Sequence, residues 1–189
     1  MSKAGPKRRA VFTDRDGTLA EEVGYLNHIS RFRLFPFAAA AIRRLNEAGW
    51  PVIVVTNQSG VARGFFPEAL IHAVHSQMTA ELAAAGARVD GIYYCPHKIE
   101  DNCRCRKPRP GLLDRAAREH NLELAGSYFV SDLWADLEMA HSIRCRSVLV
   151  LTGYGRGEYE WHRARWPRQP DLVTKDFGEA VNAILEEQR

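Results

Sequence analysis

Residues 9–18 read RAVFTDRDGT, a short apolar run that ends in two aspartates and a glycine. A run with so little polar interruption is typical of a strand buried on both faces of a sheet. Similar runs follow at 51–56 (PVIVVT), 91–95 (GIYYC), 127–132 (SYFVSD), 147–151 (SVLVL) and 171–176 (DLVTKD). These segments predict the strands of one sheet.

Helical periodicity fills the gaps between these runs. The apolar residues that share a helix face are Ala38, Ile42 and Leu45 in one gap and Leu70, Val74, Met78 and Leu82 in the next. Further helices are expected after Pro110, after Asp132 and from Phe177 onward. Strands that alternate with helices predict right-handed crossovers, so we expect an α/β fold with a single Rossmann-like parallel sheet and helices on both faces.

Length and composition bound the class of protein. A chain of 189 residues fits one domain, expected over 1–189 with 1–8 as a flexible tail. The net charge of +3 argues neither for nor against an anionic partner. No apolar run approaches the ~20 residues of a membrane span, and no signal peptide is evident. We therefore expect a cytoplasmic monomer with no membrane partner.

One segment lacks a clear period. Residues 153–170, GYGRGEYEWHRARWPRQP, are rich in arginine and carry two tryptophans. We expect an irregular surface segment with at most one short helix. A nucleic-acid partner is not favoured, because this is a single basic patch in a chain of modest net charge.

Polar side chains gather where the predicted strands end. Ligands of an open parallel sheet bind outside the carboxyl ends of its strands, so these residues are expected around one crevice. They are Asp14 and Asp16 after the first strand, Thr56 and Ser59 in TNQSG after the second, and Asp132 and Asp136 in SDLWAD after the fourth. Lys107, in RKPRPG, precedes the third helix.

This set of residues suits phosphoryl transfer. Converging carboxylates repel each other unless a divalent cation neutralises them, and an all-oxygen site suits Mg²⁺. Together with Thr56 and Lys107, such a cation would hold a phosphate. Asp14 suits the nucleophile and Asp16 the acid and base. Each motif alone has an ordinary structural reading as a turn or a helix cap, but their joint occurrence favours a phosphatase.

A second metal is predicted at CPHKIEDNCRCRK, residues 95–107. One short loop, residues 95–105, carries four potential ligands: Cys95, His97, Cys103 and Cys105. A closed shell of three thiolates and one imidazole is typical of structural rather than catalytic zinc. Unmetallated loop cysteines are the alternative. Because Lys107 follows the last ligand almost at once, the zinc would fix the segment that carries this lysine.

The motifs DRDGT, TNQSG, RKPRPG and SDLWAD resemble the four motifs of the haloacid dehalogenase superfamily of phosphotransferases, over nearly all of residues 10–155. Within it, CPHKIEDNCRCRKPRPG is similar to the zinc-bearing branch of heptose bisphosphate and histidinol phosphatases. EEVGYLNHISRFRLFP and VVTNQSGVARGFF resemble the heptose enzymes. The resemblance implies a fold without a large cap domain and a Mg²⁺-dependent removal of the 7-phosphate from a sugar bisphosphate, a heptose 1,7-bisphosphate.

The resemblance also implies roles for individual residues. Mg²⁺ would be held by the Asp14 and Asp132 side chains and the Asp16 backbone carbonyl, with Thr56 and Lys107 stabilising the phosphoryl group. The implied substrate contacts are Arg15, Glu22, Tyr25, Asn57, Gln58, Ser59 and Arg106. The chain departs from the heptose enzymes at Leu133, where they commonly carry a lysine, and in a short 97–103 loop that the histidinol branch shares.

Other readings stay open at this point. The substrate could be histidinol phosphate or a nucleic-acid end, the latter if WHRARWPRQP forms a basic groove. A catalytically silent binding module is a third reading, which the retention of both Asp14 and Asp16 disfavours. His72 and His75 are expected to face solvent, and His28 is a weaker candidate for a substrate contact.

Overall fold

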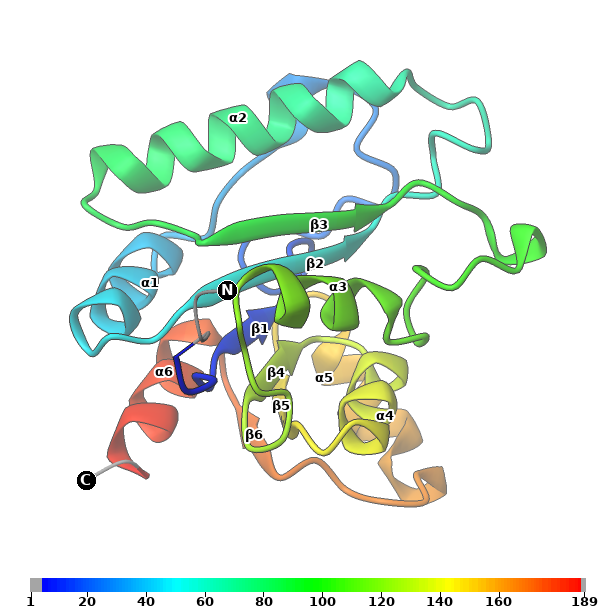
Figure 1. The fold of residues 1–189 in the computed structure, drawn as a ribbon. Helices are drawn as coiled ribbons and strands as arrows, with labels where there is room; N and C mark the ends of the chain where they lie inside the picture. The colour runs from blue at the N-terminus through cyan, green and yellow to red at the C-terminus, as the bar shows by residue number, and fades with distance from the viewer. Residues whose placement is uncertain (1–4, 188–189) are drawn as a thin grey trace.

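The computed structural model describes residues 5–187, and its strands form one six-stranded sheet (Figure 1). Every neighbouring pair of strands is parallel, and the order is β3-β2-β1-β4-β5-β6. The strands are β1 Val11–Thr13, β2 Val52–Asn57, β3 Gly91–Cys95, β4 Tyr128–Ser131, β5 Arg146–Val150 and β6 Leu172–Thr174. The predicted Rossmann-like parallel sheet is confirmed.

Helices cover both faces of this sheet. The side chains of α1 (Ala38–Glu47), α2 (Glu68–Ala84) and α6 (Phe177–Glu186) share one buried apolar cluster with one face of the strands. Those of α3 (Gly111–Glu119) and α4 (Trp134–Ser142) share a second cluster with the other face. Short helical turns occur at η1 (Ile29–Arg31) and η2 (Ile99–Asp101).

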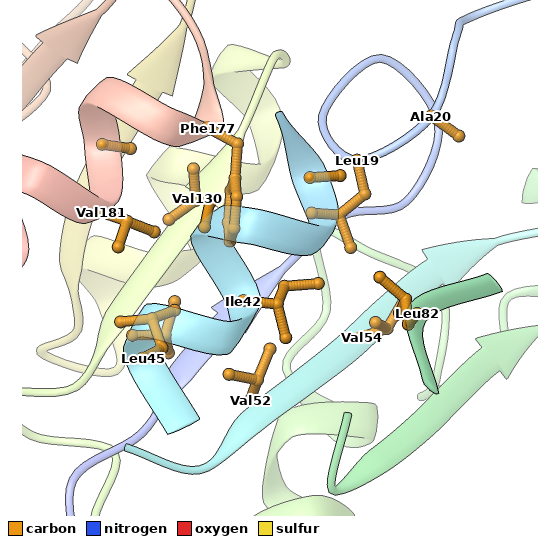
Figure 2. Close-up of a cluster of buried hydrophobic side chains, with 14 of the residues drawn as sticks. Leu19, Ala20, Ile42, Leu45, Val52, Val54, Leu82, Val130, Phe177 and Val181 are labelled. Carbon is orange, nitrogen blue, oxygen red and sulfur yellow. The ribbon is translucent and has the colours of Figure 1, made fainter. Parts of the chain in front are cut away.

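The first cluster shows why the sequence pattern predicts the fold. Ile42 and Leu45, which share a face of α1, pack over Val52 of β2, and all three side chains are fully buried (Figure 2). Phe177 of α6 completes this layer beside Val130 of β4. Burying one such side chain stabilises the fold by about 1.5–3 kcal/mol, so this face fixes both helices on the sheet.

The strand order reverses next to β1, whose neighbours β2 and β4 lead to opposite edges of the sheet. A reversal of this kind leaves a crevice at the carboxyl ends of the strands. Gly17 lets the chain turn there: its φ is +77°, and a Cβ at this position would lie 2.0 Å from Asp132 Oδ2. Any side chain at residue 17 would therefore displace that carboxylate.

The segment without clear periodicity is more helical than expected. It contains α5 (Gly155–Gly157), η3 (Glu158–His162) and η4 (Arg163–Arg165) in direct succession. Trp166 then stacks on Trp134 of α4, with ring centroids 4.7 Å apart. This non-local aromatic contact, which local periodicity does not reveal, anchors the segment.

Residues 1–4 of the expected tail lie outside the described part of the chain. Of its remaining residues, Arg8 forms a bridge to Leu122, and Gly5 O accepts a hydrogen bond from Asn121. None of the described helices is long and apolar enough to cross a membrane. The single-domain, monomeric and cytoplasmic expectations stay predictions.

Candidate active site

A buried lysine links a carboxylate at the carboxyl end of β1 to one in the first turn of α4. Lys107 Nζ lies 2.6 Å from Asp136 Oδ2 and 3.0 Å from Asp14 Oδ1. Burial lowers the pKa of Lys107, but the Asp136 and Asp14 charges outweigh burial and raise it above its ordinary value. Lys107 is therefore a fixed positive charge beside Asp14.

Asp14 itself is only 6% exposed. Burial raises its pKa to about 6, and the nearby Asp136 and Asp16 charges add to the rise while Lys107 opposes it. A carboxylate with little hydration and a cation beside it can act as a nucleophile toward an electrophile in the crevice.

Asp132 provides the evidence for a cation. Its Oδ2 accepts a hydrogen bond of 2.9 Å from the Tyr154 backbone, whereas its buried Oδ1 has no hydrogen-bond partner among residues 5–187. Burial and then the Asp14 charge raise the pKa of Asp132 to about 8. A buried carboxylate oxygen with no donor, beside a second carboxylate, fits a hard divalent cation such as Mg²⁺.

Asp16 is held from two sides. Arg15 donates from Nε to Asp16 Oδ1 (3.1 Å) and from Nη2 to Oδ2 (2.8 Å). Gln58 Nε2 donates to the same Oδ2 (2.8 Å) and to Thr56 Oγ1 (2.9 Å). The carboxylate thus has a defined orientation at the edge of the crevice.

Most of the residues predicted from the sequence surround one narrow pocket of about 130 Å³. Its predicted lining residues are Asp14, Asp16, Glu22, Tyr25, Thr56, Asn57, Gln58, Ser59 and Lys107. Burial raises the pKa of Glu22 to about 7. Tyr25 meets Phe65 edge to face, with centroids 4.7 Å apart, so the 22–25 loop touches the loop after β2 at the pocket mouth.

Three of the predicted site residues do not line this pocket. Asp132 does not line the pocket and is 1% exposed, close enough to Asp14 for the two charges to interact. Arg15 is 1% exposed and lies behind Asp16, so it reaches a substrate only through that carboxylate. Arg106 lines a neighbouring depression with Ile99 and donates to His97 O at 3.1 Å.

Asn57 holds the backbone of Lys107, a role that the sequence does not reveal. Its Nδ2 donates to Lys107 O and its Oδ1 accepts from Lys107 N, both at 3.1 Å. Because both amide atoms are engaged, Asn57 positions the Lys107 segment as well as lining the pocket.

The Cys/His cluster on the other flank of Lys107 is arranged to hold a metal. The ligand atoms of Cys95, His97, Cys103 and Cys105 all lie within 4.8 Å of one another. The Sγ atom of Cys105 lies 3.3 Å from that of Cys95 and 3.4 Å from that of Cys103. A tetrahedral shell with Zn–S bonds of about 2.3 Å separates its sulfurs by roughly 3.7 Å, close to these spacings.

Two groups contribute to the site in ways that the sequence did not predict: Asp136, which was expected at the crevice without a role, and His75. Asp136 pairs with Lys107 and accepts from Ser131 Oγ at 2.8 Å; its place one helical turn after Asp132 was the available signal. The prediction that His75 faces solvent is wrong, because this side chain is 9% exposed and lies 3.1 Å from Arg15 Nη1. His72 is exposed as expected.

The burial of His75 predicts a pH effect on stability. Burial and then the Arg15 charge lower its pKa from 6.5 to about 4, so the folded chain holds it neutral where the unfolded chain takes up a proton. Stability present above 6.5 is thus lost as the pH falls toward 4. Between about pH 7 and about pH 5, we expect the free energy of unfolding measured in urea to fall by about 2 kcal/mol more for the wild type than for His75→Gln. Equal losses would contradict the buried neutral state.

Comparisons with known proteins place this site in a family. A HAD-hydrolase-like family model matches residues 104–180. A D-glycero-β-D-manno-heptose-1,7-bisphosphate 7-phosphatase of Salmonella typhi is 39% identical over the full length of both chains. A D-glycero-D-manno-heptose-1,7-bisphosphate 7-phosphatase of Thermosynechococcus vestitus is 38% identical, over 94% of this chain and 95% of the relative. The chain belongs to the heptose bisphosphate phosphatase family of the haloacid dehalogenase superfamily.

A solved structure agrees with this assignment. The D,D-heptose 1,7-bisphosphate phosphatase of B. bronchiseptica, crystallised with magnesium and phosphate, superimposes with a TM-score of 0.87. It is 35% identical to this chain, and the match covers 95% of this chain and 99% of that one. The predicted resemblance is confirmed, and the chain is a phosphoric monoester hydrolase like its relatives. The crevice at the carboxyl ends of β1, β2 and β4 lies where open parallel α/β sheets bind their ligands.

Proposed function

We propose that this phosphatase hydrolyses the 7-phosphate ester of D-glycero-D-manno-heptose 1,7-bisphosphate through a phosphoryl–Asp14 intermediate. The observation that carries the proposal is the juxtaposition of Asp14, Asp16 and Lys107 around one narrow pocket. The relatives' names supply the substrate, and several of them specify the β anomer.

The reaction follows from the positions of these three side chains. An oxygen of Asp14 attacks phosphorus, the bond from phosphorus to the sugar oxygen breaks, and Asp16 gives its proton to the leaving alkoxide. Asp16 then takes a proton from water, whose oxygen attacks the same phosphorus and releases inorganic phosphate and free Asp14. Lys107 stays charged throughout and stabilises negative charge on the phosphoryl oxygens, aided by the Thr56 hydroxyl.

The metal sites have separate tasks in this proposal. The Asp14 and Asp132 carboxylates and the Asp16 carbonyl would hold Mg²⁺, which supplies neutralisation of the phosphoryl charge. The orphaned Asp132 Oδ1 supports this assignment. The Cys/His cluster would hold structural zinc, since four protein ligands leave no open position for a substrate.

The pocket favours a phosphate on a primary carbon. A CH₂-linked 7-phosphate can enter a narrow pocket while the sugar stays against the loops that carry Glu22, Tyr25 and Ser59. A 1-phosphate joins the ring directly, so its entry would press the ring against the TNQSG loop. Leu133 also lines the pocket, where an apolar side chain offers the sugar no charge. Arg106, outside the pocket, is a candidate contact for the distal phosphate.

The test is phosphorus NMR of the reaction with the β-1,7-bisphosphate, run beside the α anomer, fructose 1,6-bisphosphate and histidinol phosphate. We expect the primary ester signal to disappear and the anomeric phosphate signal to persist. Loss of the anomeric signal first would overturn the orientation. Faster turnover of histidinol phosphate than of either heptose bisphosphate would overturn the substrate.

A further inference from the structure

The guanidinium of Arg15 is buried behind the general acid and has one more partner. Its Nε and Nη2 atoms donate to the two carboxylate oxygens of Asp16, a paired contact that sets the plane of that carboxylate. Its Nη1 atom lies 3.1 Å from Nε2 of His75, sixty positions further along the chain. Arg15 therefore joins Asp16, at the edge of the pocket, to α2.

The protonation state of His75 follows from its partner. An arginine donates through every nitrogen and accepts through none, so His75 Nε2 accepts this hydrogen bond and the ring carries its proton on Nδ1. Burial and the Arg15 charge both disfavour a second proton, which agrees with the lowered pKa of His75. The ring is a neutral acceptor that satisfies a buried cation.

The surroundings of His75 hold the ring in place. Tyr94 of β3 meets it with ring centroids 5.6 Å apart, and Thr79 Oγ1 donates to the His75 backbone carbonyl at 2.8 Å. The same Tyr94 donates to Glu68 Oε1 at 2.7 Å, which ties its own ring to the start of α2. His75 is thus anchored to α2 and packed against β3, both outside the pocket.

We propose that His75 is a positioning residue for catalysis: it fixes Arg15, and through Arg15 the orientation of the Asp16 carboxylate toward the leaving oxygen. This inference rests on the proposed role of Asp16 as the general acid. A proton donor is effective only within hydrogen-bond reach of the departing oxygen and along the right direction. Without His75, the Nη1 group loses the acceptor that it has among residues 5–187. The guanidinium can then turn toward a different acceptor, which tilts the Asp16 carboxylate.

The alternative is a purely structural role, in which His75 only helps to pack α2 on the sheet. The two readings differ in their dependence on the leaving group. A nitrophenolate departs without a proton, whereas a sugar alkoxide needs one. A misplaced general acid therefore slows sugar phosphate cleavage selectively, while a general loosening of the fold slows both substrates alike.

The experiment compares kcat/KM for the sugar bisphosphate and for 4-nitrophenyl phosphate, because kcat/KM reports the step in which the leaving group departs. We expect His75→Leu to lower kcat/KM for the sugar bisphosphate by about 10- to 100-fold and for the aryl phosphate by less than about 3-fold. His75→Gln, whose side-chain oxygen can accept from Arg15, should recover most of the loss. Ser76→Leu, the next residue on α2 and exposed, is the matched control and should leave both values unchanged.

Asp16→Asn serves as the reference that separates this inference from the proposed function. If Asp16→Asn slows both substrates equally, the general-acid role fails, and the role of His75 fails with it. If Asp16→Asn is selective but His75→Leu slows both substrates equally or neither, the positioning role alone is overturned. Should His75→Leu not fold, the selectivity is measured on His75→Ala and compared with His75→Gln; equal values for these two variants would overturn it as well.

Discussion

Asp14→Asn is expected to lower kcat for the sugar bisphosphate by at least about 10³-fold, equivalent to about 4 kcal/mol of barrier. The substitution keeps the size of the side chain but removes the attacking negative oxygen and one proposed Mg²⁺ ligand. Lys107 Nζ lies 3.0 Å from Asp14 Oδ1, and the amide keeps a polar oxygen of the same size beside this ammonium, so the fold should persist. Steady-state phosphate release and urea unfolding measure the two effects separately.

Asp114→Asn is a suitable control, since this aspartate lies in the first turn of α3 and outside the pocket. It should retain full activity. If Asp14→Asn kept a tenth of wild-type activity, this would contradict a phosphoryl–Asp14 intermediate, because the attack on phosphorus would then not depend on the Asp14 carboxylate. A burst of nitrophenolate equal to the enzyme concentration, present in the wild type and absent in the variant, would give independent support.

The sheet could be predicted because its information is local. Each buried strand is a run of apolar residues, and parallel strands bring their carboxyl ends together whatever the loops do. For that reason the positions of Asp14, Thr56 and Asp132 in the sequence are enough to predict that they share one crevice. The same rule cannot say which carboxylate meets Lys107, and the partner proved to be both Asp14 and Asp136.

The residues that sequence reasoning missed depend on contacts between distant segments. His75 follows the buried Val74 on α2, and its polarity predicted exposure; only a cation from the first loop, sixty positions away, makes its burial favourable. Tyr154 contributes a backbone N–H to Asp132, and a backbone group has no signature in the sequence. Gly153 marks that approach, since a Cβ there would lie 2.2 Å from Asp132 Oδ2.

Removal of one ligand from the Cys/His cluster is the second change with a large expected effect. Zinc–thiolate binding supplies on the order of 10 kcal/mol of folding free energy, comparable to the whole stability of a domain. Cys105→Ser should therefore lower zinc from about one per chain toward zero and shift the urea midpoint strongly downward. Cys103 and Cys105 also pack against the apolar cluster under α3, so the loss is not confined to a surface loop.

Activity should fall together with zinc, because Lys107 lies two residues after Cys105 and its buried ion pairs require a fixed backbone. Asn57 holds that backbone from the other side, so some geometry persists and the residual activity measures how much of it the metal supplies. Cys145→Ser is the matched control: this buried thiol contacts Leu124 O at 3.0 Å, outside the cluster, and its loss should leave the zinc content unchanged.

Brief chelation gives the contrasting case, since it should remove Mg²⁺ and stop turnover reversibly while zinc stays bound. A wild-type chain with full activity and no zinc would contradict the structural-zinc assignment, and a zinc-free Cys105→Ser with wild-type turnover would contradict the link between the cluster and Lys107.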